Sequence, residues 1–235
     1  HEDYGMVKQI EMLEEMRIQL KIEKWSLLGH SYGGMLACLY ANLYPGSIRS
    51  IVYECPCFNF SISTKSVAEY LIKYFIENNN SKGISRCKEI LDKEYKISDA
   101  ASFEDMMSIL KLVSDNPQIR NYLHGISFDE YVSSYSTEGI TNDMWAKSNT
   151  HLNKLVEDGM MFSDFLPLLS QNYHRSLLIT AKYDPVCREE QINFFRKFSK
   201  NGYFKEFSES GHFPRIEEAV KYTNCVKEFI ENSTE

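Results

Sequence analysis

The sequence predicts an α/β protein, with a mostly parallel sheet flanked by helices and a helical cap inserted between two strands. Two observations predict this class. In residues 1–58 and 174–235, short apolar runs alternate with amphipathic or small-residue stretches, as strands and helices do in turn. In residues 59–173 no convincing strand is found, and apolar residues recur at helical spacing. We therefore expect a core in two pieces, 1–58 and 174–235, and a cap at 59–173.

The first core piece is expected to alternate helices and strands. Residues 4–20 have a helical period of apolar side chains, and residues 22–28 predict a short buried strand that ends at Gly29. Small apolar residues predict a helix over 35–43, and residues 48–53 predict a second buried strand. Because buried strands joined by helices run parallel, their carboxyl ends are expected at one edge of the sheet.

The rest of the chain is expected to supply the cap and the second core piece. One helical face in the cap carries apolar residues at three- and four-residue spacing, namely Val67, Tyr70, Leu71, Tyr74 and Phe75. Further cap helices are expected at residues 86–94, 103–113, 118–124 and 151–156. The second core piece is expected to contain strands at 177–181 and 203–207 and a final helix at 217–230. Such a cap would cover the sheet edge at which α/β proteins bind ligands.

Composition excludes several classes of function. The 235 residues carry 26 Lys and Arg against 33 Asp and Glu, a net charge of −7, so a nucleic-acid partner is not expected. No apolar run approaches the roughly 20 residues that span a bilayer, and we expect a soluble cytoplasmic protein without a membrane partner. Six cysteines without CxxC spacing predict reduced thiols. Cys55 and Cys57 adjoin an apolar strand and are expected to pack rather than to bind metal.

The pattern G-x-S-x-G stands where an expected strand leads into an expected helix, at Gly29, Ser31 and Gly33. Its glycines would let the strand and the helix approach closely, while the serine takes a strained backbone conformation that exposes its hydroxyl. A neutral serine is a weak nucleophile. This interpretation therefore requires a histidine base and an acid that orients the histidine.

Two later loops supply the candidates. Asp184 follows the expected strand 177–181, and His212 lies in a glycine-containing loop after the expected strand 203–207. In a parallel sheet both loops would lie at the same edge as Ser31. A serine, an acid and a histidine in that arrangement predict acyl transfer by nucleophilic catalysis, with no cofactor and no metal.

These motifs resemble those of the α/β-hydrolases, and in particular of the proline iminopeptidase-like serine hydrolases. The resemblance rests on Gly-His-Ser-Tyr-Gly-Gly at 29–34, Tyr-Asp-Pro-Val-Cys at 183–187 and Ser-Gly-His-Phe-Pro-Arg-Ile-Glu-Glu at 210–218. In layout it covers nearly the whole chain, whereas the cap matches only in length and character. The resemblance implies an α/β-hydrolase core with a nucleophile elbow and an inserted helical cap.

The resemblance also implies a role for each matched residue. Ser31 would be the nucleophile, Asp184 the acid and His212 the base of a catalytic triad, and the backbone N–H of Tyr32 would be one oxyanion donor. The implied activity is release of an N-terminal residue from a small peptide, as in a prolyl aminopeptidase. A buried substrate amine needs a carboxylate partner from the cap. The candidates are Glu69, Glu77, Glu104, Glu130, Glu138 and Glu157.

Two other functions remain open. Residues 52–58 depart from the Arg-Gly-Ile-Phe run associated with proline iminopeptidases. The methionines and aromatic residues of the cap would equally suit an apolar acyl pocket. One alternative is therefore a carboxylesterase or lactonase that acts on small acyl substrates. The other is a catalytically silent module of this fold that binds a small ligand.

One departure from the family concerns the start of the chain. In the family the elbow follows the fifth of eight strands, whereas here only one helix is expected before it. The loop that supplies the second oxyanion donor has no counterpart in these residues. The strand at 22–28 would then be an unpaired apolar edge. We expect the chain, which begins at His1, to be a truncated, cleaved or partial polypeptide whose sheet is completed by a separate N-terminal segment of the same protein.

Overall fold

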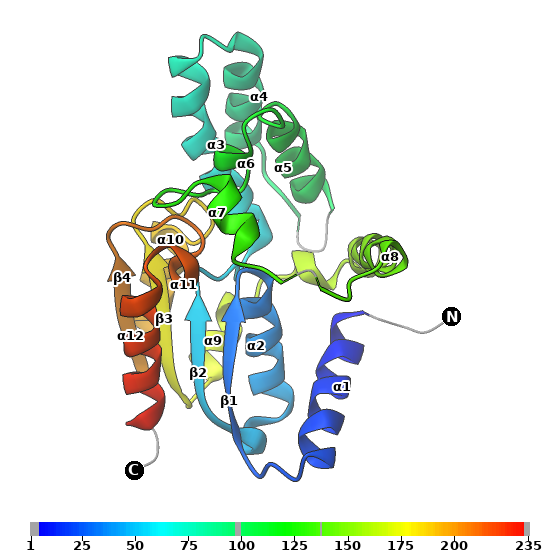
Figure 1. The fold of residues 1–235 in the computed structure, drawn as a ribbon, viewed down its shortest axis with the longest axis vertical. Coiled ribbons are helices and arrows are strands. Elements are labelled where there is room, and N and C mark those ends of the chain that lie inside the picture. Colours follow the sequence, from blue (N-terminus) through cyan, green and yellow to red (C-terminus); the bar gives the residue numbers. More distant parts are fainter. Residues whose placement is uncertain (1–4, 97–99, 137, 233–235) are drawn as a thin grey trace.

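A computed structural model describes residues 5–96, 100–136 and 138–232. In these residues the sheet has four strands, β1 (Trp25–His30), β2 (Ile48–Glu54), β3 (Arg175–Ala181) and β4 (Gly202–Phe207), in the order β1-β2-β3-β4. All neighbouring pairs are parallel, so the carboxyl ends of the strands lie at one edge (Figure 1). This confirms the predicted class.

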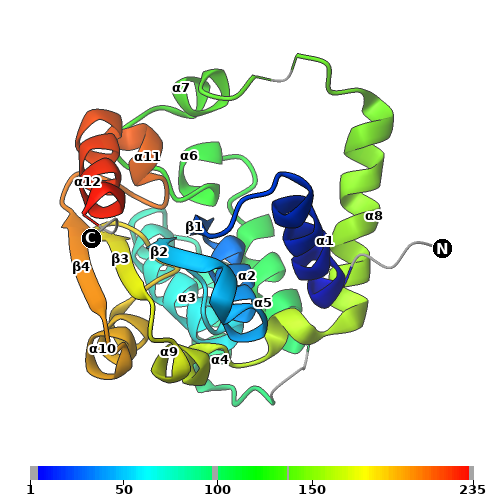
Figure 2. The ribbon, with the colours of Figure 1, turned by 90° about the horizontal axis from the view of Figure 1, so that it is seen from below.

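Helices cover both faces of the sheet because its side chains alternate between two apolar layers. The bounds of these helices are α1 (Met6–Gln19), α2 (Tyr32–Leu43), α9 (Leu166–Gln171), α10 (Glu189–Phe198) and α12 (Ala219–Glu231). On one face Val52 and Ile179 pack with Tyr222 and Phe229 of α12. Figure 2 shows α2, α9 and α10 on the opposite face, where Tyr53 is buried in the larger core.

Most of the helices between β2 and β3 lie above or beside the carboxyl edge of the sheet (Figure 1). They are α3 (Phe60–Glu77), α4 (Ser81–Asp92), α5 (Ala101–Lys111), α6 (Pro117–Arg120), α7 (Phe128–Ser133) and α8 (Asn142–Asp158). Asn59, Asn80 and Asn116 cap the first turns of α3, α4 and α6 with their side chains. The boundaries 58/59 and 173/174 that we gave to the cap stay a prediction, and α9, just before the second boundary, packs on α2 and α10.

Several elements differ in extent from their predictions. The predicted strand 22–28 is found at Trp25–His30, and the predicted helix 151–156 is the second half of α8. The predicted helix 118–124 is a single turn, α6, because the chain leaves the helix and Tyr122 takes a φ of +58°. The predicted final helix divides into α11 (Pro214–Glu217) and α12, and α10 was not predicted.

Strand β1 is an outer strand of the sheet in the described residues, and Leu28 on it is 49% exposed. An exposed apolar outer strand can pair with a further segment. The N-terminal segment that we expect to complete the sheet remains a prediction.

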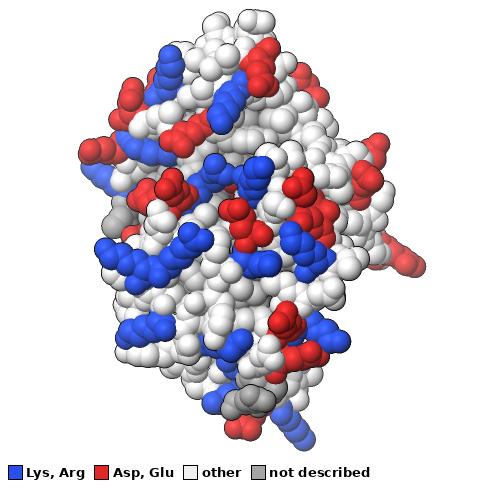
Figure 3. Space-filling model, turned by 90° about the vertical axis from the view of Figure 1, so that its left-hand side faces the viewer, with Lys and Arg blue, Asp and Glu red and all other residues white. Residues whose placement is uncertain are grey.

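Within the described residues no helix has the length and apolarity that crossing a membrane requires. On the face shown in Figure 3, basic and acidic side chains are interspersed and form no continuous surface of one sign.

Candidate active site

Ser31 lies in the tight turn between β1 and α2. Its φ of +53° is a strained value for a residue with a side chain. Three backbone hydrogen bonds hold it: the Ser31 N–H donates to the Glu54 carbonyl at 3.1 Å, and the Ser31 carbonyl accepts from Gly34 at 2.9 Å and from Cys57 at 3.0 Å. The turn is therefore fixed to the end of β2 and to the loop that follows it.

Close packing at this turn requires Gly29 and Gly34. A Cβ on Gly29 would lie 2.2 Å from the carbonyl oxygen of Gly33, and a Cβ on Gly34 would lie 2.5 Å from the Cβ of Pro56. The contact at Gly29 would force β1 away from α2, and the contact at Gly34 would force α2 away from the loop after β2. A Cβ on Gly33 would meet no atom within 4 Å. The expected role in close approach holds for Gly29 and is wrong for Gly33, while sequence reasoning missed Gly34.

The structure brings Asp184 and His212 together. His212 Nδ1 lies 2.8 Å from Asp184 Oδ1, and both side chains are buried. The two carboxylate oxygens of Asp184 also accept the backbone N–H groups of Val186 and Cys187, each at 3.0 Å. Because an ionised carboxylate can only accept hydrogen bonds, the neutral imidazole of His212 carries its proton on Nδ1, which faces Asp184. Its Nε2 then has a free lone pair.

Ser31 and His212 line one small pocket of about 110 Å³. Most of the remaining wall is apolar and consists of Met35, Phe60, Met106, Met161 and Val186. Apart from His212, the described residues that line it include no titrating acid or base other than Tyr32, Tyr122 and the thiol of Cys57. The pocket therefore matches a compact, uncharged group.

Tyr32 is the first residue of α2, and the N–H groups of a helix's first turn have no acceptor within the helix. They also carry the positive end of the helix dipole, which favours an oxyanion. The side chain of Tyr32 lines the pocket, and its hydroxyl accepts a hydrogen bond from Gln9 of α1 at 3.1 Å. Burial raises the pKa of Tyr32 to about 12, so the phenol stays neutral.

His30 packs beside His212. Its Nε2 lies 2.9 Å from the His212 carbonyl oxygen and therefore carries the proton that it donates. Its ring centroid is 4.6 Å from that of His212 and 4.9 Å from that of Phe213. Burial, which is the largest cause, and the electrostatic effects of His212 and Arg215 lower the pKa of His30 to about 2. His30 is thus a neutral support for the histidine loop.

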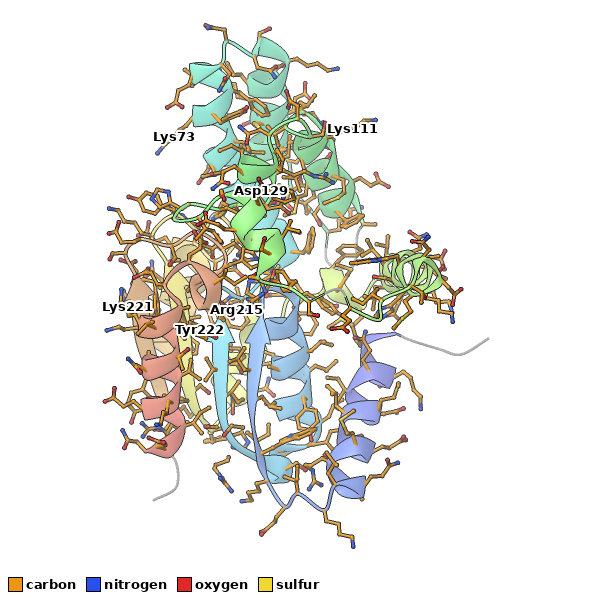
Figure 4. All side chains as sticks on the ribbon, viewed as in Figure 1. Lys73, Lys111, Asp129, Arg215, Lys221 and Tyr222 are labelled. Atoms are coloured by element: carbon orange, nitrogen blue, oxygen red, sulfur yellow. The ribbon has the colours of Figure 1, made fainter. Side chains whose placement is uncertain are left out.

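A buried ion pair anchors the same loop to β2. Glu54 is fully buried, and Arg215 Nη1 lies 3.2 Å from each of its carboxylate oxygens. Tyr222 of α12 donates its hydroxyl to Glu54 at 3.1 Å, and Arg215 Nη2 donates to the Tyr135 hydroxyl after α7 at 2.9 Å. Figure 4 labels Arg215 and Tyr222, which lie together where α11 and α12 meet the carboxyl end of β2. Burial raises the pKa of Glu54, although Arg215 opposes this effect.

The cysteines near the site are buried. Cys55 Sγ, together with ligand atoms of Asp184 and His212, forms a group within 4.8 Å, which is a spacing that could hold a metal ion. Two of these three groups are already joined by the hydrogen bond between Asp184 and His212. Burial raises the pKa of Cys55 well above its ordinary value, so the protonated thiol is favoured. Packing beside the acid is the role that these contacts support.

Sequence reasoning missed the residues that link the loops. Glu54 ends an apolar strand, and a carboxylate there indicates a buried partner because isolated buried charges are costly. His124 of the cap stacks on Tyr183, the residue before Asp184, with ring centroids 3.3 Å apart.

The proposed amine-binding residues lie elsewhere: none of Glu69, Glu77, Glu104, Glu130, Glu138 and Glu157 lines the pocket of Ser31.

Comparison with known proteins gives consistent matches. The sequence model of a family described as alpha/beta hydrolase fold matches residues 1–81. A proline iminopeptidase from Heyndrickxia coagulans is 28% identical over 80 residues, which cover 34% of this chain and 27% of that protein. The match therefore spans well under two thirds of that relative.

Solved structures extend the likeness to the whole chain. An esterase from Exiguobacterium antarcticum superposes with a TM-score of 0.62 at 16% identity, over 98% of this chain and 75% of the esterase. A proline iminopeptidase from Mycobacterium smegmatis superposes with a TM-score of 0.57 at 13% identity, over 95% and 70%. At these identities the structures show a likeness of the fold alone.

Proposed function

The chain is a member of the α/β-hydrolase superfamily, and from this premise we propose that it is a serine hydrolase that cleaves an ester or amide through an acyl-enzyme. The single observation that carries the proposal is the position of His212. Its ring faces a pocket shared with Ser31, while its Nδ1 lies 2.8 Å from Asp184. This arrangement supports Ser31 as the nucleophile, His212 as the base and Asp184 as the acid that orients it.

The proposed reaction proceeds in two halves. Ser31 Oγ bonds to the substrate carbonyl carbon as its proton passes to His212 Nε2, and Asp184 stabilises the imidazolium. The N–H of Tyr32 faces the negative carbonyl oxygen. The leaving group departs with the proton from His212, which completes the acyl-enzyme. Water then attacks the ester with His212 again as base, and the acid product and free Ser31 result.

The pocket favours a small apolar acyl group. Its volume of about 110 Å³ holds only a few heavy atoms, and its wall is mainly methionine, phenylalanine and valine side chains. Flexible thioethers adapt to acyl chains of different shape. We therefore infer a carboxylesterase or lactonase acting on short acyl substrates as the finer activity.

Proline iminopeptidase activity is the second candidate, because residues of this chain match a protein of that name. An N-terminal amine would need a carboxylate, which the described lining of the Ser31 pocket does not provide. Hydrolysis of a proline arylamide compared with a short-chain aryl ester separates the two. Higher kcat/KM for the arylamide would contradict the inference of an acyl pocket.

The test of the proposed function is covalent labelling by a fluorophosphonate. In this reaction Ser31 Oγ bonds to phosphorus, fluoride leaves, and the serine proton passes through His212 to water. We expect the intact mass of the protein to increase by one adduct, and we expect no adduct on Ser31→Ala. An unlabelled wild-type protein that still binds a small acyl ligand would instead support a catalytically silent binding module.

A further inference from the structure

Glu217 lies at the end of α11, five residues after the candidate base, and its carboxylate accepts four backbone N–H groups. Oε1 accepts from Gly211 at 3.0 Å and from Phe213 at 3.1 Å. Oε2 accepts from His124 at 2.8 Å and from Gly125 at 2.7 Å. Oε1 therefore accepts hydrogen bonds from the residues on both sides of His212, and Oε2 accepts hydrogen bonds from a segment of the cap.

The four donors belong to parts of the chain that are far apart in sequence. His124 and Gly125 follow α6 in the cap, whereas Gly211 and Phe213 belong to the histidine loop after β4. Hydrogen bonds to an ionised carboxylate are roughly twice as strong as those between neutral groups. The carboxylate thus fixes the cap segment, residues 122–125, against the histidine loop, residues 209–213.

Independent contacts join the same two segments. The His212 N–H donates to the Tyr122 carbonyl at 3.0 Å, and the Tyr122 ring meets the His212 ring edge to face at 5.8 Å. A Cβ on Gly211 would lie 2.1 Å from the Tyr122 carbonyl oxygen. Tyr122 has a φ of +58°, a strained conformation that persists only where its surroundings impose it. The contact is therefore close, and it leaves no room for a side chain at 211.

Tyr122 also lines the pocket that Ser31 and His212 share. A shift of the cap segment would therefore change the pocket wall and the backbone of the base together. Displacement of a reacting group by about 1 Å can cost 100-fold in rate. A residue that holds this contact acts on the reaction without touching the substrate.

We propose that Glu217 is the positioning residue of His212: its carboxylate clamps cap residues 122–125 to histidine-loop residues 209–213, and the imidazole is placed for proton transfer only while that clamp is closed. The proposal rests on the proposed function. It assigns a positioning role to a side chain that does not line the pocket of Ser31 and His212.

The test compares Glu217→Gln with a control in the same loop, Glu209→Gln. An amide keeps the shape of the side chain but presents NH₂ to two of the four donors, so it cannot accept all of them. Glu209 is exposed, and its substitution removes the same charge. Glu217→Ala removes all four acceptor contacts. Gly211→Ala opens the contact without any change of charge, because the new Cβ would push Tyr122 away.

The decisive readout is the time course of labelling by an excess of fluorophosphonate. A positioning role lowers the rate constant while every molecule is still labelled in the end. A purely structural role lowers the labelled fraction and leaves the rate constant of the folded molecules unchanged. We expect a 10- to 100-fold lower rate constant for Glu217→Gln, a larger drop for Glu217→Ala, and a change of less than twofold for Glu209→Gln.

Hydrogen exchange on peptides that cover residues 120–126 shows whether the clamp has opened. We expect faster exchange there in Glu217→Gln and wild-type exchange in Glu209→Gln. Faster exchange with a wild-type labelling rate constant would overturn the positioning role, and so would unchanged exchange. Labelling of the wild-type protein that Ser31→Ala abolishes would meanwhile uphold the proposed function. If the wild-type protein is not labelled, both proposals fail together.

Discussion

Removal of Arg215 should leave the buried carboxylate of Glu54 without its counter-charge. Glu54 is 0% exposed at its side chain and Arg215 is 28% exposed, so water can reach the cation but not the anion. Breaking a buried ion pair from one side costs about 3–5 kcal/mol. Because Tyr222 still donates a hydrogen bond to Glu54, we expect Arg215→Met to lower the free energy of unfolding by about 3 kcal/mol at pH 7, near the lower end of that range.

The loss of unfolding free energy in Arg215→Met should depend on pH, and the raised pKa of Glu54 determines the direction of that dependence. Burial raises this pKa above its ordinary value, so the folded state binds a proton more tightly than the unfolded state does. Stability from this group therefore falls as pH rises from the unfolded pKa toward the folded pKa. Without Arg215 the folded pKa rises further, and the penalty extends to higher pH. The difference between wild type and Arg215→Met should be small near pH 5 and grow toward pH 8.

Urea unfolding at pH 5, 6, 7 and 8 measures both quantities. In the double variant Glu54→Gln/Arg215→Met, the uncompensated charge is gone, and we expect about 2 kcal/mol of the loss at pH 7 to be recovered. Tyr135→Phe is the matched control for the cap contact of Arg215 and should cost less than about 1 kcal/mol at every pH. A loss that does not vary between pH 5 and 8, or a double variant no more stable than Arg215→Met, would refute the reasoning.

Three further predictions concern the site. Asp184→Asn should lower kcat by about 10³- to 10⁴-fold in ester hydrolysis, because an amide NH₂ facing Nδ1 favours the wrong imidazole tautomer; a loss below tenfold would exclude Asp184 as the orienting acid. Gly29→Ala should strongly lower the urea concentration at the midpoint of unfolding, whereas Gly33→Ala should leave it near the wild-type value, because of these two positions a Cβ clashes only at Gly29. Equal midpoints for the two variants would contradict this account. His30→Gln should keep the fall of kcat/KM at acidic pH, because the pKa of His30 is already lowered to about 2 and a different group must cause that fall. If the fall disappears in His30→Gln, it must be assigned to His30.

The strands and the chemistry-bearing residues could be predicted because local patterns encode them. All four strands were expected from short local stretches of the sequence, and the positions of Ser31, Asp184 and His212 followed from the strand ends. The amphipathic helix α10 is equally local, and the sequence analysis passed over it. The end of the predicted helix 118–124 was wrong for a different reason. Tyr122 leaves the helical conformation to contact the histidine loop, and that contact joins residues 90 positions apart along the chain.

The links between loops could not be predicted because they depend on tertiary contacts. Nothing local distinguishes Glu217 from Glu218, which is its neighbour in the motif at 210–218. In the structure Glu217 accepts four backbone N–H groups, whereas Glu218 bonds to Ser210, to the Glu209 N–H and to Lys221. A carboxylate can satisfy several donors only where folding has already brought them together.

The end of β2 is the point from which the three candidate catalytic residues are positioned. The Glu54 carbonyl accepts the N–H of Ser31, and the N–H of Cys55 donates to the carbonyl of Ile179 on β3, the strand that leads to Asp184. The carboxylate of the same Glu54 holds Arg215, three residues after His212. The loops that carry Ser31, Asp184 and His212 are thus all linked to two consecutive residues, Glu54 and Cys55. Because β2 lies between β1 and β3, the sheet fixes the points at which the three loops are anchored. The contact of Glu217 with the cap then sets the histidine loop within that frame.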